Sequence, residues 1–369
     1  MVSAFAPGRL ELIGNHTDYN EGFVIAFAVN LGVTIRGEPR DDGTVVLRSP
    51  EFGQDSFSIQ NLQKDVRTPW SNHIKGVLFE LQKVGAPLNG FEADIMTTLP
   101  VGAGMGSSAA VQVATLLFAQ KLFGFSFGDL ADPAVKMSMA LICSKAENDF
   151  VGVRCGIMDP AASLLGKKDA AVFLDCRFNS AENLPLPPEM CFVVCHTGVK
   201  HMLISSKYNA RRSECDEAVR LLQLNHHPIK TLRDITSLKL REHSGLFLPR
   251  VFQRAMHVAS ENERVLQARE AMMRRDVTTL GRLMYESHES SRQAFENSTQ
   301  FLDMLVDIAK TLPVCVGARL TGGGFGGATI NMVRRDCAEG FMNELISQYR
   351  LKSGKEPQAF IVEASPGAA

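Results

Sequence analysis

The stretch Leu99-Pro-Val-Gly-Ala-Gly-Met-Gly-Ser-Ser-Ala-Ala110 decides the fold, because alternating glycines join two elements of different kind. Residues 91–97 before it are predicted to form a strand. Residues 109–122 after it are predicted to form a helix, with Ser107 or Ser108 as its N-cap. A strand, a glycine loop and a helix start in this order predict a loop that can hold a ligand at the helix N-terminus.

The composition of this loop favours phosphate as the ligand. Glycines at Gly102, Gly104 and Gly106 allow positive φ and close approach of the backbone, and the helix start offers free N–H groups. The hydroxyls of Ser107 and Ser108 can bond phosphate or coordinate Mg²⁺. No Lys is present, so the loop is not of the G-x-x-x-x-G-K-[ST] type. The alternative is a tight strand–helix turn made of small residues.

Length and charge limit the remaining possibilities. The chain has 369 residues, which predicts two domains, and its net charge of -1 argues against a general nucleic-acid binder. Strands and helices are expected in both halves, giving an α+β fold. The turn Leu184-Pro-Leu-Pro-Pro188 is the best domain boundary, so we predict domains at residues 1–183 and 189–369.

Neither a membrane span nor an export signal is expected. Residues 95–120 are uncharged, but Pro100 and the loop glycines disfavour a membrane-spanning helix. Eight cysteines are scattered without a C-x-x-C pair, which is typical of reduced cysteines in a cytoplasmic protein. Cys191, Cys195 and His196 come closest to metal-ligand spacing, but residues 190–196 are predicted to form a buried strand.

A second glycine loop, Leu320-Thr-Gly-Gly-Gly-Phe-Gly-Gly-Ala-Thr329, contains a formal G-x-G-x-x-G. A strand rather than a helix is predicted after it, at residues 328–333, so the context of a dinucleotide site is missing. We therefore expect a glycine-lined turn packed closely against another element. The alternative is an ordinary hairpin bend.

Two further clusters carry polar chemistry. The segment Ala6-Pro-Gly-Arg-Leu-Glu-Leu-Ile-Gly-Asn-His-Thr-Asp-Tyr-Asn20 is predicted to be a polar loop after an apolar patch, suited to a small polyhydroxylated ligand. Taken singly, each of its polar residues could be a surface turn or cap. Glu147, late in a predicted helix over residues 134–150, and Asp159, in a following glycine loop, could be a metal ligand and a base, or two solvated acids.

These motifs together resemble the signatures of the GHMP small-molecule kinases, and the first resembles the galactokinase signature within that superfamily. Further galactokinase-like blocks follow in the expected order: Trp70-Ser-Asn-His-Ile-Lys-Gly76, Gly156-Ile-Met-Asp159, Ser206-Lys-Tyr-Asn-Ala-Arg-Arg-Ser-Glu-Cys215 and Glu286-Ser-His-Glu-Ser290. The resemblance covers nearly the whole chain. It implies a two-domain GHMP kinase fold with mixed sheets and helices, and an active site in the cleft between the domains.

The same resemblance implies ATP-dependent phosphorylation of a sugar at its anomeric hydroxyl, with D-galactose as the first candidate. Asp159 matches the catalytic aspartate, which takes the hydroxyl proton, and Arg9 matches the arginine beside it. Ser108 and Glu147 match the Mg²⁺ ligands.

Binding residues are implied in the same way. Residues 102–108 match the phosphate loop, with Trp70 at the adenine of ATP. The residues that match sugar contacts are Asn15, His16, Asp18, Gly156 and Tyr208. Small-molecule sugar and MgATP are the expected partners, and a monomer is expected.

The chain departs from the galactokinase pattern at Asn15, where Glu is usual, and at Glu11, where Asn is usual. Pro160 stands where Gln is usual, and Ala328 where Cys is usual. The loss of a carboxylate at Asn15 is expected to weaken galactose binding and to allow a C6 carboxylate, with His16 as a second donor. The alternatives are thus a kinase for galacturonate or an amino sugar, or a non-catalytic homologue that senses galactose and ATP.

Overall fold

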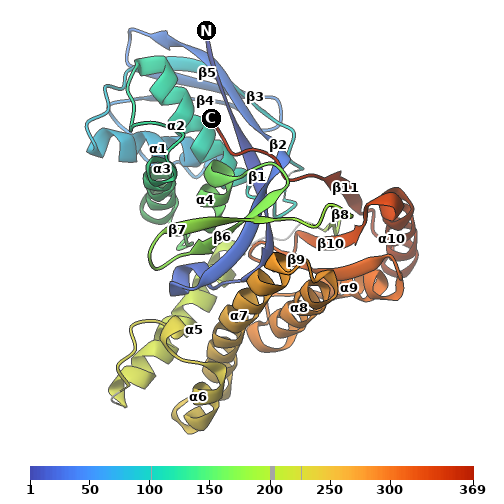
Figure 1. Ribbon diagram of the computed structural model, residues 1–369. Coiled ribbons are helices and arrows are strands. Elements are labelled where there is room, and N and C mark those ends of the chain that lie inside the picture. The colour runs from blue at the N-terminus through green and yellow to red at the C-terminus, as the bar shows by residue number, and fades with distance from the viewer. Residues whose placement is uncertain (101, 200–203, 226) are drawn as a thin grey trace.

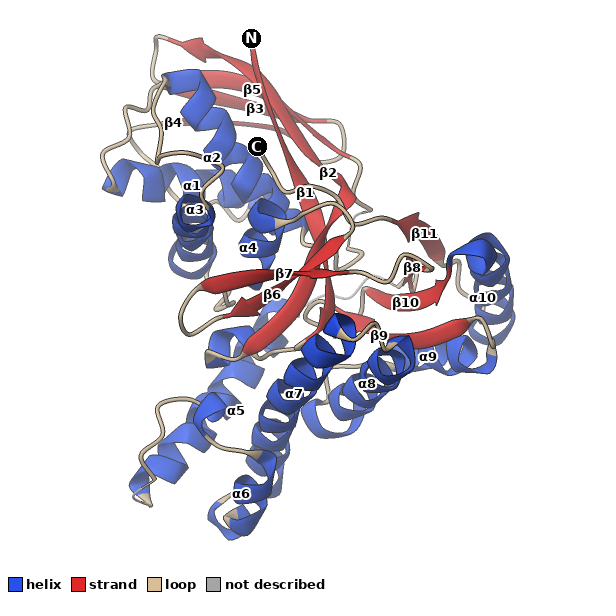
Figure 2. Cartoon of the chain, in the orientation of Figure 1, coloured by secondary structure: helices blue, strands red, loops and turns tan. Residues whose placement is uncertain are grey.

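The computed structural model describes residues 1–100, 102–199, 204–225 and 227–369, and its elements form two sheets flanked by helices (Figures 1 and 2). This arrangement confirms the predicted α+β class. Val101, within the first glycine loop, lies outside the described residues. None of the helices in the described ranges combines the length and apolar character that crossing a membrane requires.

The larger sheet has seven strands in the order β4-β3-β5-β2-β6-β7, with β1 paired to β2. Neighbours are antiparallel except β3 and β5, which run parallel. Its strands are β1 (Val2–Ile13), β2 (Phe23–Arg40), β3 (Thr44–Ser49), β4 (Gly53–Ser58), β5 (Gly90–Thr97), β6 (Ala170–Asp175) and β7 (Ser180–Pro185). The predicted loop over residues 6–20 is wrong in its first half, because Arg9 and Glu11 lie on β1. The register of β1 shifts at both residues, between Pro7 and Arg9 and between Glu11 and Ile13.

Helices α2 (Ser107–Phe123) and α4 (Met158–Leu165) pack against this sheet. Around them pack α1 (Asn72–Lys83), α3 (Pro133–Lys145) and the π-helical turn η3 (Ala146–Val151). The central helix α2 is apolar all round because it contacts β1 and β2 on one side and α1, α3 and α4 on others. The helix predicted over residues 134–150 is shorter in the structure: α3 ends at Lys145, and Glu147 lies in the π-helical turn η3 that follows. A helix over α4 was not predicted.

The smaller sheet has four strands in the order β11-β8-β10-β9. They are β8 (Met190–His196), β9 (Cys315–Thr321), β10 (Ala328–Arg334) and β11 (Gln358–Val362), close to the predicted bounds. Helices α8 (Val277–Ser290), α9 (Gln300–Thr311) and α10 (Ala338–Ser353) pack against this sheet. Helix α7 (Pro249–Met273) contacts β2, and α5 (Ile204–Leu224) and α6 (Ser237–Glu242) pack against α7 (Figure 1). Short helical turns are η1 (Asp18–Asn20), η2 (Pro69–Ser71), η4 (Leu232–Asp234), η5 (Ser244–Leu246), η6 (Ser291–Phe295) and η7 (Arg335–Cys337).

The chain passes from the larger to the smaller sheet between β7 and β8, at the proline-rich turn. The domain bounds at residues 1–183 and 189–369 stay a prediction, because one apolar core continues across both halves and includes Val265, Leu283 and Ile330. The C-terminal segment also returns to the larger sheet: the Ser365 N–H donates to the Ala28 carbonyl at 2.9 Å. The two halves thus share a core and a cleft.

Candidate active site

The first glycine loop adopts the backbone that its sequence allows. Gly102, Gly104 and Gly106 have φ of 78°, 66° and 69°, a region that other residues rarely adopt. Gly106 is itself the N-cap of α2, so the prediction of a serine cap is wrong: the left-handed conformation needed here favours glycine. As a result Ser107 and Ser108 form the first turn, where free N–H groups and the positive end of the helix dipole suit phosphate.

The second glycine loop packs directly against the first, which confirms the predicted glycine-lined turn. A Cβ added at Gly104 would lie 3.0 Å from the Thr321 carbonyl oxygen, and one at Gly322 would lie 3.0 Å from the Gly104 carbonyl oxygen. A Cβ at Gly324 would lie 2.3 Å from the Asn297 carbonyl oxygen. Backbone contact this close excludes side chains, so the second loop supports the first rather than binding a dinucleotide.

Arg9 and Asp159 form a bidentate ion pair at the edge of the first loop. The distances are 2.7 Å from Nε to Oδ1 and 2.5 Å from Nη2 to Oδ2. Arg9 also donates through Nη1 to the Gly104 carbonyl oxygen, and its backbone N–H donates to Met105 at 2.9 Å. Asp159 lies in the first turn of α4, not in a glycine loop as predicted. This arginine therefore fixes the carboxylate relative to the phosphate loop.

A cavity of about 190 Å³ opens beside this pair. Its lining includes all the residues predicted to act in catalysis and in metal binding, and most of those predicted to contact sugar: Arg9, Asn15, His16, Asp18, Ser108, Glu147, Asp159 and Tyr208. Gly156 is not among the lining residues. A Cβ there would lie 2.3 Å from Asp18 Oδ2, so Gly156 acts by leaving room for that carboxylate.

Asp18 is a half-buried carboxylate that lines the cavity. Burial raises its pKa to about 7, and the nearby negative charge of Asp159 adds to the shift. A carboxylate in this position accepts hydrogen bonds from hydroxyl groups of a ligand when it is ionised. The site therefore holds an acceptor whose charge changes close to neutral pH.

His16 is held as a neutral imidazole. Burial lowers its pKa to about 3, and Nε2 donates to the Gly323 carbonyl at 3.0 Å while Nδ1 accepts from the Tyr19 hydroxyl at 2.9 Å. Its ring packs 4.8 Å from the ring of Tyr208. Both ring nitrogens are thus bonded to protein groups and the ring carries no positive charge, while its role as a second donor to a C6 carboxylate stays a prediction.

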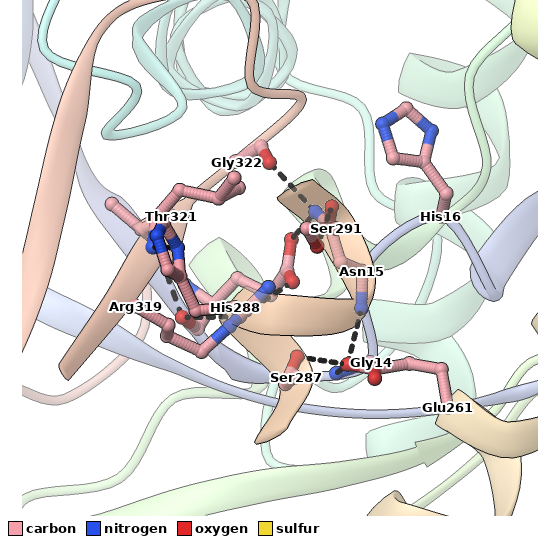
Figure 3. A network of polar contacts seen from close by, with 12 residues as sticks. Gly14, Asn15, His16, Glu261, Ser287, His288, Ser291, Arg319, Thr321 and Gly322 are labelled. Carbon is pink, nitrogen blue, oxygen red and sulfur yellow. Dashed lines mark hydrogen bonds and ion pairs between the residues drawn. The ribbon is translucent and has the colours of Figure 1, made fainter. Parts of the chain in front are cut away.

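The side chain of Asn15 is occupied by protein partners (Figure 3). Its Nδ2 donates to the Gly322 carbonyl at 2.7 Å and to Glu11 Oε2 at 3.2 Å. Its Oδ1 accepts from Asn297 Nδ2 at 2.7 Å. A direct contact of Asn15 with sugar stays a prediction, and it would require one of these hydrogen bonds to break.

A buried polar network behind the cavity holds this loop, and the sequence did not predict it. Glu261 on α7 is fully buried, and its Oε1 accepts from the backbone N–H groups of Gly14 at 3.0 Å and Asn15 at 3.2 Å (Figure 3). Although burial opposes ionisation, Arg264 holds the pKa of Glu261 well below its usual range. His257, one turn earlier on α7, bonds the Asn15 carbonyl at 3.0 Å. A histidine and an acid four residues apart on α7, His257 and Glu261, were the signal available in the sequence.

Glu147 and Ser108 also line the cavity. Gln112 Nε2 donates to Glu147 Oε2 at 2.5 Å, and His73 Nδ1 lies 2.9 Å from the same oxygen. Both contacts use one oxygen, which leaves Oε1 for a cation. Among the described residues no cluster of three or more His, Cys, Asp or Glu could hold a metal. One carboxylate and one hydroxyl fit Mg²⁺, which keeps waters and phosphate oxygens as its other ligands.

Trp70 lines a second, more apolar cavity of about 210 Å³. Its indole stacks on Phe52 with ring centroids 6.2 Å apart, and Leu99 and Val111 complete the wall. Ser108 lines both cavities. An aromatic cavity that meets a polar one at a glycine loop and helix start has the arrangement that a nucleotide and a second substrate require.

Models of three protein families match the chain. The GHMP kinases N terminal domain matches residues 72–167, the GHMP kinases C terminal domain matches residues 268–350, and the galactokinase galactose-binding signature matches residues 2–39. The galactokinase of Chloroflexus aurantiacus is 40% identical over 99% of this chain and 92% of its own. Human galactokinase is 37% identical over 100% of this chain and 91% of its own.

Solved structures agree with these relatives. Lactococcus lactis galactokinase complexed with galactose superposes with a TM-score of 0.94 at 29% identity, covering 100% of this chain and 94% of that one. Methanococcus jannaschii mevalonate kinase, at a TM-score of 0.68 and 16% identity over 98% of both chains, shares the fold. With 40% identity over nearly its full length, the chain belongs to the galactokinases of the GHMP kinase family.

Proposed function

We propose that the protein transfers the γ-phosphoryl group of MgATP to the anomeric hydroxyl of D-galactose, giving galactose 1-phosphate and ADP. The observation that carries the proposal is the Arg9–Asp159 pair, which lies between the polar cavity and the glycine loop. The galactose complex of the Lactococcus lactis relative supports the choice of sugar.

Asp159 orients the C1 hydroxyl in this mechanism and accepts its proton as the bond to phosphorus forms. Its side chain is 32% exposed while that of Arg9 is 6% exposed, so the carboxylate is open to the cavity and the guanidinium is not. Arg9 keeps the carboxylate in one orientation relative to the phosphate loop. Positioning of this kind supplies much of the catalysis in phosphoryl transfer.

The nucleotide is expected to place its base against Trp70 and its phosphates at Gly102, Gly104, Gly106 and Ser107. Ser108 and Glu147 would hold Mg²⁺, which when bound neutralises charge on the phosphates. His73 and Gln112 fix the Glu147 carboxylate through Oε2. The N-terminal N–H groups of α2 stabilise negative charge at the same point.

The sugar is expected to lie against Asp18 and Tyr208. An ionised Asp18 accepts hydrogen bonds from ring hydroxyls, and the wrong epimer would leave this half-buried acceptor unpaired. The intact Arg9–Asp159 pair favours an enzyme over a non-catalytic sensor. A monomer that works in the cytoplasm, where MgATP is available, completes the proposal.

A panel of sugars tests the proposal by ADP release in a coupled assay, with product identified by mass and phosphorus NMR. Galactose should give the highest kcat/KM among galactose, glucose, galacturonate and galactosamine, with phosphate on C1. Binding of galactose and MgATP without ADP release would support the sensor instead.

A further inference from the structure

Glu11 is a buried carboxylate in the wall of the sugar cavity that the mechanism above does not use. It is 1% exposed and lies on β1, two residues beyond Arg9. Its Oε1 lies 2.8 Å from Arg319 Nη1, and its Oε2 lies 3.2 Å from Asn15 Nδ2. Glu11 thus joins a buried cation on β9 to the loop that borders the sugar.

Arg319 depends on Glu11 for its charge partner. Its side chain is fully buried, and within the described ranges its Nε and Nη2 have no hydrogen-bond partner. Removing the carboxylate would leave a buried guanidinium without an ion pair, which is strongly destabilising. Arg319 also directly precedes Leu320 and the second glycine loop, so the ion pair fixes β1 against that loop.

The cavity wall has an excess of negative groups. Among the described lining residues the only cation is Arg9, and it is paired with Asp159; the carboxylates are Glu11, Asp18, Glu147 and Asp159. A sugar with a C6 carboxylate would add a negative charge and find no free cation in this wall. The charge of this wall therefore argues against a uronic acid as the substrate, although Asn15 alone suggested that one could be tolerated.

A carboxylate at position 15 would be unfavourable while Glu11 is present. The Asn15 amide now donates to Glu11 Oε2 at 3.2 Å and to the Gly322 carbonyl at 2.7 Å. An aspartate would put a carboxylate oxygen at these distances, and the longer glutamate would have to fit its carboxylate among the same acceptors. Two carboxylates this close cannot both ionise without cost. One carboxylate and one amide therefore satisfy the contact between residues 11 and 15, and two carboxylates do not.

We propose that Glu11 and Asn15 form one specificity-determining unit, in which Glu11 supplies the carboxylate at this end of the cavity and Asn15 links it to the sugar-binding loop. The unit keeps the site selective for a neutral hydroxymethyl group at C6. This inference rests on the proposed function. It predicts that the two residues can be exchanged together but not one at a time.

The test is a double-mutant cycle of the full chain: wild type, Glu11→Asn, Asn15→Glu and the double variant Glu11→Asn/Asn15→Glu. KM and kcat are measured for galactose, galacturonate and 6-deoxygalactose, and Tm is measured for each protein. Each single variant should raise KM for galactose on the order of tenfold with a smaller change in kcat, and lower Tm. The double variant should recover part of the loss in KM and in Tm, because the carboxylate moved to position 15 lies beside the place of Glu11 Oε2 and becomes the acid available to Arg319.

Glu11→Gln, which is nearly isosteric, is added in case Glu11→Asn fails to fold, and it should raise KM in the same direction. The proposal is overturned if Asn15→Glu alone binds galactose as well as wild type, if the double variant is no better than the worse single one, or if wild type prefers galacturonate. Absence of ADP release with every sugar would instead overturn the proposed function, and the coupling in Tm would then decide the pairing of residues 11 and 15.

Discussion

Arg9 and Asp159 lie 150 residues apart in the sequence and meet through two parallel hydrogen bonds of 2.7 and 2.5 Å. One partner comes from the first strand and the other from the first turn of α4. Planar bidentate geometry fixes the carboxylate in direction as well as in place. The carboxylate that we propose as the base is therefore oriented by the fold itself.

Asp159→Asn should lower kcat on the order of 10²-fold or more, because the amide cannot accept the hydroxyl proton. Nucleotide binding should persist. The chain has a single tryptophan, Trp70, so its fluorescence reports occupancy of the apolar cavity directly. A variant that keeps near-normal kcat would show that Asp159 is not the base.

Glu147→Gln should raise the Mg²⁺ concentration needed for half-maximal rate, because a charged hard ligand is lost. Binding of Mn²⁺ to the ADP complex, followed by electron paramagnetic resonance, should weaken in parallel. Asp149→Asn is the matched control, since Asp149 lies in the same turn η3 and is exposed. Equal behaviour of the two variants would make Glu147 a structural residue only.

Galactose binding should depend on pH through Asp18, whose pKa is raised to about 7. As pH rises through 7 the carboxylate ionises and becomes a better acceptor, so KM for galactose should fall between pH 6 and pH 8. The effect of Asp18 on folding has the opposite sign. Between the ordinary carboxyl pKa and pH 7, Asp18 is protonated in the folded state and ionised in the unfolded state. Its contribution to the free energy of unfolding therefore decreases as pH rises through this range. Asp18→Asn should remove the inflection from the plot of KM against pH. An inflection that persists in this variant would show that another group titrates in this range.

Gly156→Ala should raise KM for galactose on the order of tenfold, because the new methyl group would lie 2.3 Å from Asp18 Oδ2 and displace that carboxylate. Gly340→Ala is the control: an added Cβ there meets nothing within 4 Å, and the residue lies inside α10. Steady-state kinetics on both variants separate a local displacement from a general effect of alanine.

Sequence patterns predicted the fold well where periodicity is long and uninterrupted. The uninterrupted apolar run over residues 190–196 was correctly predicted as a buried strand, with the bounds of β8, and residues 109–122 were correctly predicted as helix, within α2. By contrast β1 was read partly as a loop, since Pro7 and Gly8 look like turn residues. Helix α10 was missed although Phe341, Leu345 and Tyr349 repeat every four residues.

The candidate site shows the same division. Local motifs predicted most of the polar residues that line the cavity, because glycines, hydroxyls and carboxylates cluster in short segments of the sequence. They could not show that Asn15 is saturated by Asn297 and Gly322, or that Glu261 holds the loop from α7, because such contacts join distant segments. The chemistry of a residue can be read from its type, but its free hydrogen-bonding capacity depends on tertiary partners.

The return of the C-terminal segment to the larger sheet has a consequence for how the chain folds on the ribosome. Gly367 donates to the Gly166 carbonyl at 2.7 Å and Ala368 to the Ser163 carbonyl at 2.9 Å, at the end of the helix that begins with Asp159. Domains generally fold as they emerge, starting from the N-terminus. In the nascent chain the carbonyl groups of Ser163 and Gly166 lack these partners until residues 367 and 368 have been made, so the C-terminal end of α4 gains its last backbone hydrogen bonds only after the second half of the chain has been synthesised.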